Sequence, residues 1–198
     1  MAMFSVVART KEFDPDVALQ RALELFWRKG YEATSIADLV EHLGIGRASL
    51  YATFGDKREL YLKAYDRYLE NGIDFVDLLS QPGPVLPAVR ALVERYAEEA
   101  AHDVLRRGCL VVNTAVELVP RDRVLARRVE ANWDFLEATL TSALARARAQ
   151  GELAEDKEPR ALARFLLTFM QGIRVIGKSS NDPARLRDAA DQALSILS

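Results

Sequence analysis

Apolar residues recur at helical spacing along most of the chain. Ile36, Leu39, Val40 and Leu43, for example, follow the i, i+3, i+4, i+7 spacing that puts side chains on one face of a helix. No segment has the sustained alternation of apolar and polar residues that is typical of a half-buried β-strand. The pattern therefore predicts an all-α protein of about nine helices.

Capping residues, prolines and glycines set the expected ends of these helices. Asp14 and Pro15 are a typical helix start, because the Asp side chain can accept hydrogen bonds from free N–H groups and Pro suits the first helical position. The segment 81–84 (Gln-Pro-Gly-Pro) is the clearest break in the chain. The expected helices span about residues 15–30, 36–43, 47–53, 57–79, 85–96, 103–118 (interrupted near Gly108), 122–150, 159–178 and 183–197.

Composition places the chain among ordinary globular proteins. Hydrophobic residues make up 49% of it and charged residues 28%, so intrinsic disorder is not expected. The single cysteine, Cys109, excludes an intramolecular disulfide and a cysteine-rich zinc site, and His42 and His102 leave little for a histidine-based metal site. No apolar run has the length of a membrane span, and residues 1–8 lack the basic region of a secretory signal. We expect a cytoplasmic protein with no metal, no cofactor and no membrane partner.

Net charge does not favour nucleic acid as a partner. The formal net charge is −2, whereas nucleic-acid-binding domains usually carry a basic footprint. Any prediction of DNA binding must therefore rest on a motif and on a local patch.

Residues 34–54 have the spacing of a helix-turn-helix, in which the second helix enters the major groove of DNA. Gly44 suits the turn, and apolar residues such as Leu39 and Leu50 can hold the two helices at a fixed angle. Between residues 44 and 58, three basic residues stand against one acidic residue, so the patch is basic locally. On the pattern alone, a helical hairpin that merely packs remains an alternative.

The N-terminal part also resembles a known family. The stretches FDPDVAL (13–19), ALELFWRKGYEATS (22–35) and LGIGRASLYATFGDK (43–57) closely resemble the N-terminal domain of TetR/AcrR-type transcriptional repressors. The resemblance extends over about residues 12–70 without a gap. It implies an all-α homodimer that binds a palindromic operator through its N-terminal three-helix domain.

The resemblance also implies a division of the chain and a set of partners. A DNA-binding domain is expected over residues 1–56, after a flexible lead-in over 1–12. A regulatory and dimerisation domain is expected over 57–198, joined to the first by a long helix over 57–79. The implied partners are double-stranded operator DNA, a second copy of the chain and a small-molecule inducer.

The family's DNA contacts carry over by position. Thr34 and Ser35, at the start of the second helix, match residues that hold phosphates, and Lys57 matches a phosphate-binding lysine. Thr53 stands where the family often has His, which puts the contact there in doubt. The DNA-binding residues implied by the resemblance are Thr34, Ser35, Gly46, Arg47, Ala48, Ser49, Tyr51, Thr53 and Lys57.

The C-terminal part offers candidates for a dimer interface and a ligand pocket. The helix over 159–178 is apolar on more than one side and therefore needs burial on more than one side. We expect this helix and the last one to form a four-helix interface with their symmetry mates; completion of the monomer core is the alternative. Interface candidates are Leu162, Phe165, Phe169, Ile173, Ile176, Leu186, Ala190 and Leu194. Pocket candidates are Phe75, Tyr96, His102, Cys109, Asn113, Glu117, Trp133 and Phe169.

Cys109 is a candidate sensor. It follows Arg106 and Arg107, and a helix that restarts at Gly108 would place it in the first turn. Neighbouring positive charges and a helix N-terminus both favour the thiolate form of a cysteine. The segment 108–115 resembles that of family repressors that sense electrophiles or oxidants through a cysteine at this place. A buried small hydrophobe is the alternative.

Asn113 and Glu117 lie one turn apart on a largely apolar helix. Buried polar groups are costly unless they are hydrogen-bonded. They are expected either to bind the inducer or to pair with Arg127, Arg128 or Arg174.

The sequence carries no enzyme signature. It has no nucleophile elbow, no Gly-rich phosphate loop, no metal-ligand spacing and no His placed with a Ser or Asp partner, so no catalytic residue is expected. We predict a DNA-binding regulator, a repressor released by a small-molecule or oxidant/electrophile inducer. The alternative function is a helical interaction module that does not bind DNA.

Overall fold

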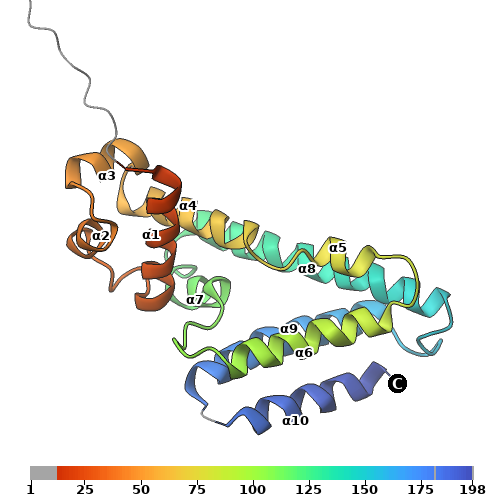
Figure 1. Cartoon of the computed structure of the whole chain (residues 1–198). Helices are drawn as coiled ribbons and strands as arrows, with labels where there is room; N and C mark the ends of the chain where they lie inside the picture. Colours follow the sequence, from red (N-terminus) through yellow and green to blue (C-terminus); the bar gives the residue numbers. More distant parts are fainter. Residues whose placement is uncertain (1–12, 181, 198) are drawn as a thin grey trace, which may run out of the picture. The chain divides into compact units, whose positions relative to one another are not determined.

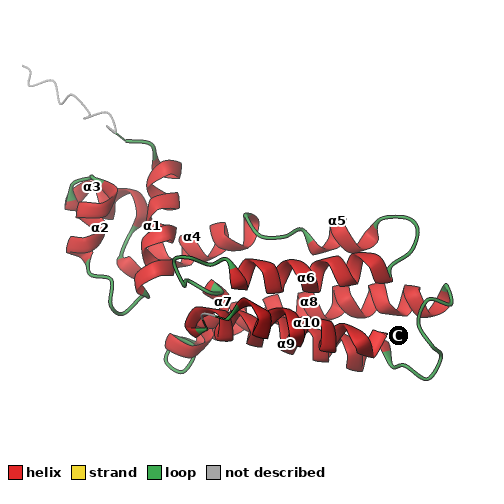
Figure 2. Ribbon diagram, turned by 60° about the horizontal axis from the view of Figure 1, so that its bottom comes forward, coloured by secondary structure: helices red, strands yellow, loops and turns green. Residues whose placement is uncertain are grey.

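The computed structural model describes residues 13–180 and 182–197, so the lead-in predicted over 1–12 lies outside the described residues. Within these ranges every regular element is helical: ten α-helices and one 3-10 turn, with no strand (Figures 1 and 2). The prediction of an all-α protein is confirmed. By its internal contacts the chain divides into two compact units, of which the first extends to Asn71 and the second begins at Gly72.

The first unit holds four helices around one core. These are α1 (Pro15–Lys29), α2 (Ile36–Leu43), α3 (Arg47–Phe54) and α4 (Lys57–Glu70). Phe26 and Tyr61 are buried and meet edge to face, with ring centroids 5.0 Å apart, so they join α1 to α4 at the centre of the unit. Outside this core, Arg67 of α4 forms an ion pair with Asp16 of α1 at 2.8 Å. Aromatic and apolar burial of this kind is the main stabilising contribution in so small a unit.

The second unit is a helical bundle. Its elements are α5 (Phe75–Ser80), α6 (Leu86–Ala101), α7 (Leu110–Glu117), α8 (Arg123–Ala149), α9 (Pro159–Ser179), α10 (Pro183–Leu194) and the 3-10 turn Ser195–Leu197. Helix α9 packs against α6, α8 and α10, and α10 also packs against α6 (Figure 2). Leu92, Leu140, Leu166 and Met170 are fully buried among these helices and form part of its core.

Four predicted helices differ from the structure by more than one residue at an end. The helix predicted over 85–96 extends further, to Ala101. The single helix predicted over 57–79 is two helices, because α4 ends at Glu70 and Asp74 caps a new helix by accepting a hydrogen bond from the Asp77 N–H at 2.8 Å. The helix predicted over 103–118 begins at Leu110. Before it the backbone turns, with the carboxylate of Asp103 accepting a hydrogen bond from the Gly108 N–H at 2.7 Å. The last α-helix stops at Leu194, and the 3-10 turn follows.

The break in the predicted helix also affects the division of the chain. Helix α4 belongs to the first compact unit, whereas the sequence assigned residues from 57 onward to the second part. The assignment of a function to each part remains a proposal.

No helix in the described part of the chain is both long enough and apolar enough to cross a membrane.

Candidate nucleic-acid interface

Helix α3 presents its polar side outward. Leu50 and Phe54 are 0% and 4% exposed and anchor the helix in the core of the first unit. On the other side, Arg47 and Ser49 are exposed, and Tyr51 is 39% exposed. Residues 50 and 54 are one turn apart, so they lie on the same side of the helix. Of the remaining predicted contacts on this segment, Gly46 and Ala48 are exposed and Thr53 is half-buried.

Arg47 and Tyr51 lie together one turn apart on α3. The guanidinium carbon of Arg47 is 5.7 Å from the centroid of the Tyr51 ring. An Arg47 Nη2–H group points to the Tyr51 hydroxyl oxygen at 3.4 Å. Such a contact between a cation and an aromatic face restricts where the guanidinium can go. The two longest side chains on the outward face of α3 are therefore partly ordered before any partner binds.

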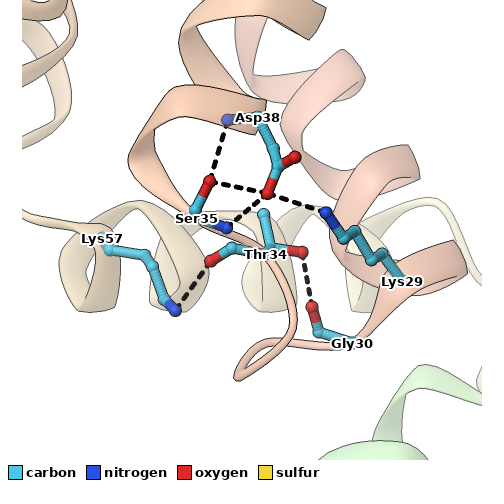
Figure 3. Close-up of polar contacts among 6 residues, drawn as sticks. All are labelled: Lys29, Gly30, Thr34, Ser35, Asp38 and Lys57. Carbon is cyan, nitrogen blue, oxygen red and sulfur yellow. Dashed lines mark hydrogen bonds and ion pairs between the residues drawn. The ribbon is translucent and has the colours of Figure 1, made fainter.

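The start of α2 is fixed by a capping box (Figure 3). The Asp38 N–H donates to Ser35 Oγ at 3.1 Å, and the Ser35 N–H donates to the Asp38 carboxylate at 2.7 Å. Lys29, at the end of α1, forms an ion pair with the same carboxylate at 2.7 Å. The hydrogen bonds from Lys29 and Ser35 hold the pKa of Asp38 well below its usual range. Ser35 stays exposed at this helix start, as the prediction of a phosphate contact requires.

Thr34 differs from the other predicted contacts. Its side chain is 0% exposed, and its hydroxyl donates to the carbonyl oxygen of Gly30 at 2.5 Å (Figure 3). A buried hydroxyl in an internal hydrogen bond is not available to a phosphate. The prediction that Thr34 contacts DNA is therefore wrong for this conformation, because the side chain closes the turn between α1 and α2 instead.

Lys57 is half-buried and ties the start of α4 to this turn. Its Nζ donates to the carbonyl oxygen of Thr34 at 2.8 Å and lies 4.2 Å from the centroid of the Tyr31 ring. A lysine ammonium has three donors, so one hydrogen bond to the protein leaves capacity for another partner. Lys57 thus lies beside the N-terminus of α2, where free N–H groups favour an anion.

The sequence missed two side chains that hold this surface in place. Lys63 Nζ donates to the carbonyl oxygen of Phe54 at 3.2 Å and so satisfies the last turn of α3. Lys29 holds the capping carboxylate of Asp38. Both were visible in the sequence as basic residues, but nothing local to them indicated which carbonyl or carboxylate they would meet.

The predicted dimer residues of the second unit separate into two groups. Phe165 and Ile176 of α9 are each 45% exposed, and Leu162 and Phe169 are half-buried. In contrast, four predicted interface residues are at most 4% exposed and belong to the core of a single chain. These are Ile173, Leu186, Ala190 and Leu194. These four fit the alternative, completion of the monomer core. Ile173 of α9 is buried in the bundle, and the apolar side of α10 is covered by α6 and α9 of the same chain.

The predicted pocket residues do not all lie together. Phe75 and Tyr96 are buried, with ring centroids 6.1 Å apart, whereas His102 is exposed at the end of α6. Trp133 and Phe169 are half-buried and pack against the core of the second unit. Burial raises the pKa of Tyr96, and the Arg174 guanidinium, 4.3 Å from the centroid of its ring, acts in the opposite direction.

Asn113 has partners that the sequence did not identify. Its Nδ2 donates to the carbonyl oxygen of Arg107 at 2.9 Å, and its Oδ1 accepts from Lys178 Nζ at 3.1 Å. The expected pairing of Asn113 with an arginine side chain is wrong. Of the arginines considered, Arg174 instead forms an ion pair with Glu99.

Cys109 and Glu117 lie at opposite ends of α7. Cys109 is 7% exposed and is the N-cap residue, so it stands one position before the helix rather than in its first turn. Glu117, the last residue of the helix, is half-buried. The low exposure of Cys109 fits the alternative of a small buried hydrophobe. Among the described residues, no group of His, Cys, Asp and Glu side chains could hold a metal ion.

Two family models match the chain. Residues 18–64 match the model described as "Bacterial regulatory proteins, tetR family". Residues 85–193 match the model described as "Tetracyclin repressor-like, C-terminal domain". Together they span both compact units.

Curated relatives and solved structures agree with these models. An uncharacterized HTH-type transcriptional regulator of Bacillus subtilis (strain 168), YezE, is 40% identical over 96% of this chain and 100% of its own length. The HTH-type transcriptional repressor ComR of Escherichia coli (strain K12) is 31% identical over 94% of this chain and 90% of its own. A cysteine mutant of the TetR family transcriptional regulator CifR, in complex with 26-bp double-stranded operator DNA, has a TM-score of 0.85 and 32% identity. That match covers 96% of this chain and 100% of the CifR chain.

Proposed function

This chain belongs to the TetR family of bacterial transcriptional regulators, and from that premise we propose that it is a repressor that binds a palindromic operator as a homodimer and is released by an inducer. Members of this family are DNA-binding regulators rather than enzymes. Because a bacterial regulator meets the chromosome in the cytoplasm, the proposed function places the protein there. The relatives named above are described as transcriptional regulators, which does not favour the alternative of a helical module that does not bind DNA.

The outward face of α3 carries the proposal. The helix keeps Leu50 and Phe54 in the core and turns Arg47, Ser49 and Tyr51 to the outside. These are donors suited to base edges and phosphates, on a helix that follows a glycine turn. Ser35 marks the N-terminus of α2 and Lys57 is a cation beside it, and both are suited to contact phosphates of the DNA backbone. The CifR complex supports the same use of this unit, since that protein is a relative bound to operator DNA.

The exposed side of α9 supports a homodimer. Phe165, Val175 and Ile176 are 45%, 48% and 45% exposed, and Gly172 is exposed between them. Three large apolar side chains on one helix face are costly to leave in water and are typical of an interface. A glycine among them allows a second helix to approach closely. We therefore propose that α9 forms the centre of the interface, in place of the buried side of α10.

A two-fold dimer explains a palindromic operator. The two recognition helices would read half-sites about one helical turn, roughly 34 Å, apart or somewhat more. Affinity would come largely from phosphate contacts and would fall as salt rises.

The inducer would act on the second unit. Phe75 and Tyr96 are buried in the core, and Trp133 and Phe169 pack against it, so a small molecule that used these rings would have to part the helices. Cys109 offers a thiol for an electrophile or oxidant. Because Cys109 is buried, a reagent must open the start of α7 to reach it. Operator release from wild type and from Cys109→Ser, each treated with a quinone, separates the two modes. Release from wild type alone supports the thiol, and equal responses remove it from the mechanism.

The experiment that tests the proposed function is a mobility shift with the DNA that flanks the protein's own gene, at stated salt. Wild type should give a specific complex, whereas Arg47→Ala and Tyr51→Ala should lose it while retaining their folded structure and dimeric mass. A helical module that does not bind DNA would give only weak retention without sequence preference. Normal shifts by both variants would show that α3 is not the reading helix.

The dimer has its own test. Ile176→Glu places a charge on the exposed face of α9 without entering the core of the chain. We expect light scattering to show a monomer and operator affinity to fall steeply. The exposed Asp188→Ala variant on α10 serves as a control that should stay dimeric. A dimer in both variants would exclude α9 as the interface.

A further inference from the structure

Arg47 is the one charged side chain of the reading helix. Helix α3 has the sequence RASLYATF, and it contains no Lys, Asn, Gln, Asp or Glu. Its exposed side consists of Arg47, two alanines, Ser49 and Tyr51. Most side chains that discriminate between base pairs in the major groove are therefore missing from this helix.

The side chains that remain differ in what they can read. A serine hydroxyl donates or accepts and so does not distinguish bases strongly, and alanine methyl groups suit the methyl group of thymine. Adenine is usually read by Asn or Gln, and cytosine by an acidic side chain, so α3 has no reader for either. The guanidinium fork of Arg47 matches O6 and N7 of guanine, the commonest specific contact in protein–DNA complexes.

The position of Arg47 fits this role. It is the first residue of α3, and the N-terminal residues of a recognition helix are those that reach base edges. The helix beneath it is fixed, because Leu50 and Phe54 are buried and Lys63 holds the last turn. The guanidinium is exposed, and no carboxylate pairs with it within residues 13–180 and 182–197. Its donors are therefore available to a base.

Tyr51 would orient this guanidinium. The ring lies beneath Arg47 at 5.7 Å, and the hydroxyl oxygen is 3.4 Å from Nη2. Because the ring contact restricts the side chain before DNA arrives, less conformational entropy remains to be lost on binding. The hydroxyl is also free to turn toward a phosphate once Arg47 has moved onto a base.

We propose that Arg47 reads one guanine in each half-site of the operator and that this contact supplies most of the direct base recognition by α3. The proposal rests on the proposed DNA-binding function and adds the identity of the base. Specificity at other positions would then come from thymine methyl groups and from the shape of the duplex.

The test begins with duplexes enriched from a random library by the full-length protein. In the enriched sequence, each guanine of the half-site is replaced in turn by 7-deazaguanine, which lacks the N7 acceptor, or by inosine. Inosine keeps O6 and N7 and loses only the minor-groove amino group, so it is the matched control on the DNA. Anisotropy titrations then give the dissociation constants at one salt concentration.

We expect one guanine per half-site at which 7-deazaguanine weakens wild-type binding about tenfold or more while inosine leaves it nearly unchanged. Arg47→Ala should bind weakly and show no difference between the three duplexes. Arg47→Lys keeps the charge but not the fork, so it should retain more affinity than Arg47→Ala and lose the preference. Tyr51→Phe keeps the ring and should keep the preference. Arg187→Ala, on the exposed side of α10, controls for the loss of one positive charge.

The outcomes separate the two proposals. If wild type enriches no sequence above non-specific binding, the proposed function itself fails. If it enriches an operator but no guanine responds to 7-deazaguanine, only the reading by Arg47 fails. An equal penalty in wild type and Arg47→Ala would also overturn the inference, because another residue would then read that guanine.

Discussion

Helices α6 and α9 approach each other closely at a glycine. Gly177 of α9 is buried and faces Ala100 of α6. A Cβ atom at position 177 would lie 2.7 Å from the carbonyl oxygen of Ala100 and 2.9 Å from its Cβ. Both distances are too short for non-bonded atoms, and neither neighbour is the flexible end of a side chain. The substitution Gly177→Ala must therefore push the two helices apart.

Two opposing effects decide the sign of this change. Replacing glycine by alanine inside a helix normally stabilises by about 0.5–1 kcal/mol. Overpacking a close-packed contact costs about 1–3 kcal/mol. The second effect is larger because a backbone atom cannot rotate away. We expect a net destabilisation of about 1 kcal/mol for Gly177→Ala, the difference between the middle values of the two effects.

The two tryptophans allow the second unit to be followed alone. Trp27 lies in α1 and Trp133 in α8, so in a Trp27→Phe background the fluorescence of Trp133 reports the second unit. Urea unfolding at one fixed protein concentration should give a lower midpoint for Gly177→Ala with an unchanged m-value.

A second substitution checks the geometry. Ala100→Gly combined with Gly177→Ala removes the contact between the two Cβ atoms and leaves the contact with the carbonyl oxygen. The double variant should therefore recover only part of the lost stability. A midpoint for Gly177→Ala equal to or above that of the parent would refute the close approach of α6 and α9.

Three further predictions concern the first unit. Thr34→Val should lower stability by about 1 kcal/mol, since the Gly30 carbonyl loses its donor, and should leave operator affinity unchanged; weaker binding at unchanged stability would return Thr34 to the DNA contacts. Because Lys29 and Ser35 lower the pKa of Asp38 in the folded protein, its carboxylate stabilises the fold above about pH 4, and this stabilisation is lost as the pH falls further. The urea midpoint of Asp38→Asn should therefore fall less with acid than that of wild type, and identical acid profiles would contradict the assignment. Lys57→Met should raise the operator dissociation constant and reduce the slope of log K against log salt by about one per protomer, whereas an unchanged slope would exclude a phosphate contact.

Local chemistry in the sequence determined the first three helices and the direction of α3. Asp14 caps α1 as expected, and Ser35 rather than its neighbour Thr34 caps α2. Gly44 ends α2 with a φ of 67°, which suits a residue without a Cβ atom. Caps and turns act over a few residues, so their signals are complete within a short stretch. Leu50, which was expected to hold the two helices together, is buried and so sets which side of α3 faces the core.

The break between α4 and α5 was readable but was overridden by a stronger pattern. Asn71 and Gly72 are a turn signal, and Asp74 is a capping residue. Apolar residues continue at helical spacing across this point, from Leu69 to Ile73, and so favoured one long helix. The turn before α7 was harder to predict. In it the carboxylate of Asp103 accepts a hydrogen bond from the Gly108 N–H, in place of a helical backbone hydrogen bond.

What covers each apolar or polar face was decided only by the tertiary structure. Periodicity shows that a side of α10 is apolar, and Leu186 and Leu194 are indeed buried, but the covering helices belong to the same chain. In the same way Asn113 finds Lys178, which is 65 residues away in the chain. A side chain's own neighbours in sequence determine its helix and its face. Its partner depends on how helices distant in sequence pack together, because a buried polar group bonds to a donor or acceptor that the packing brings within reach.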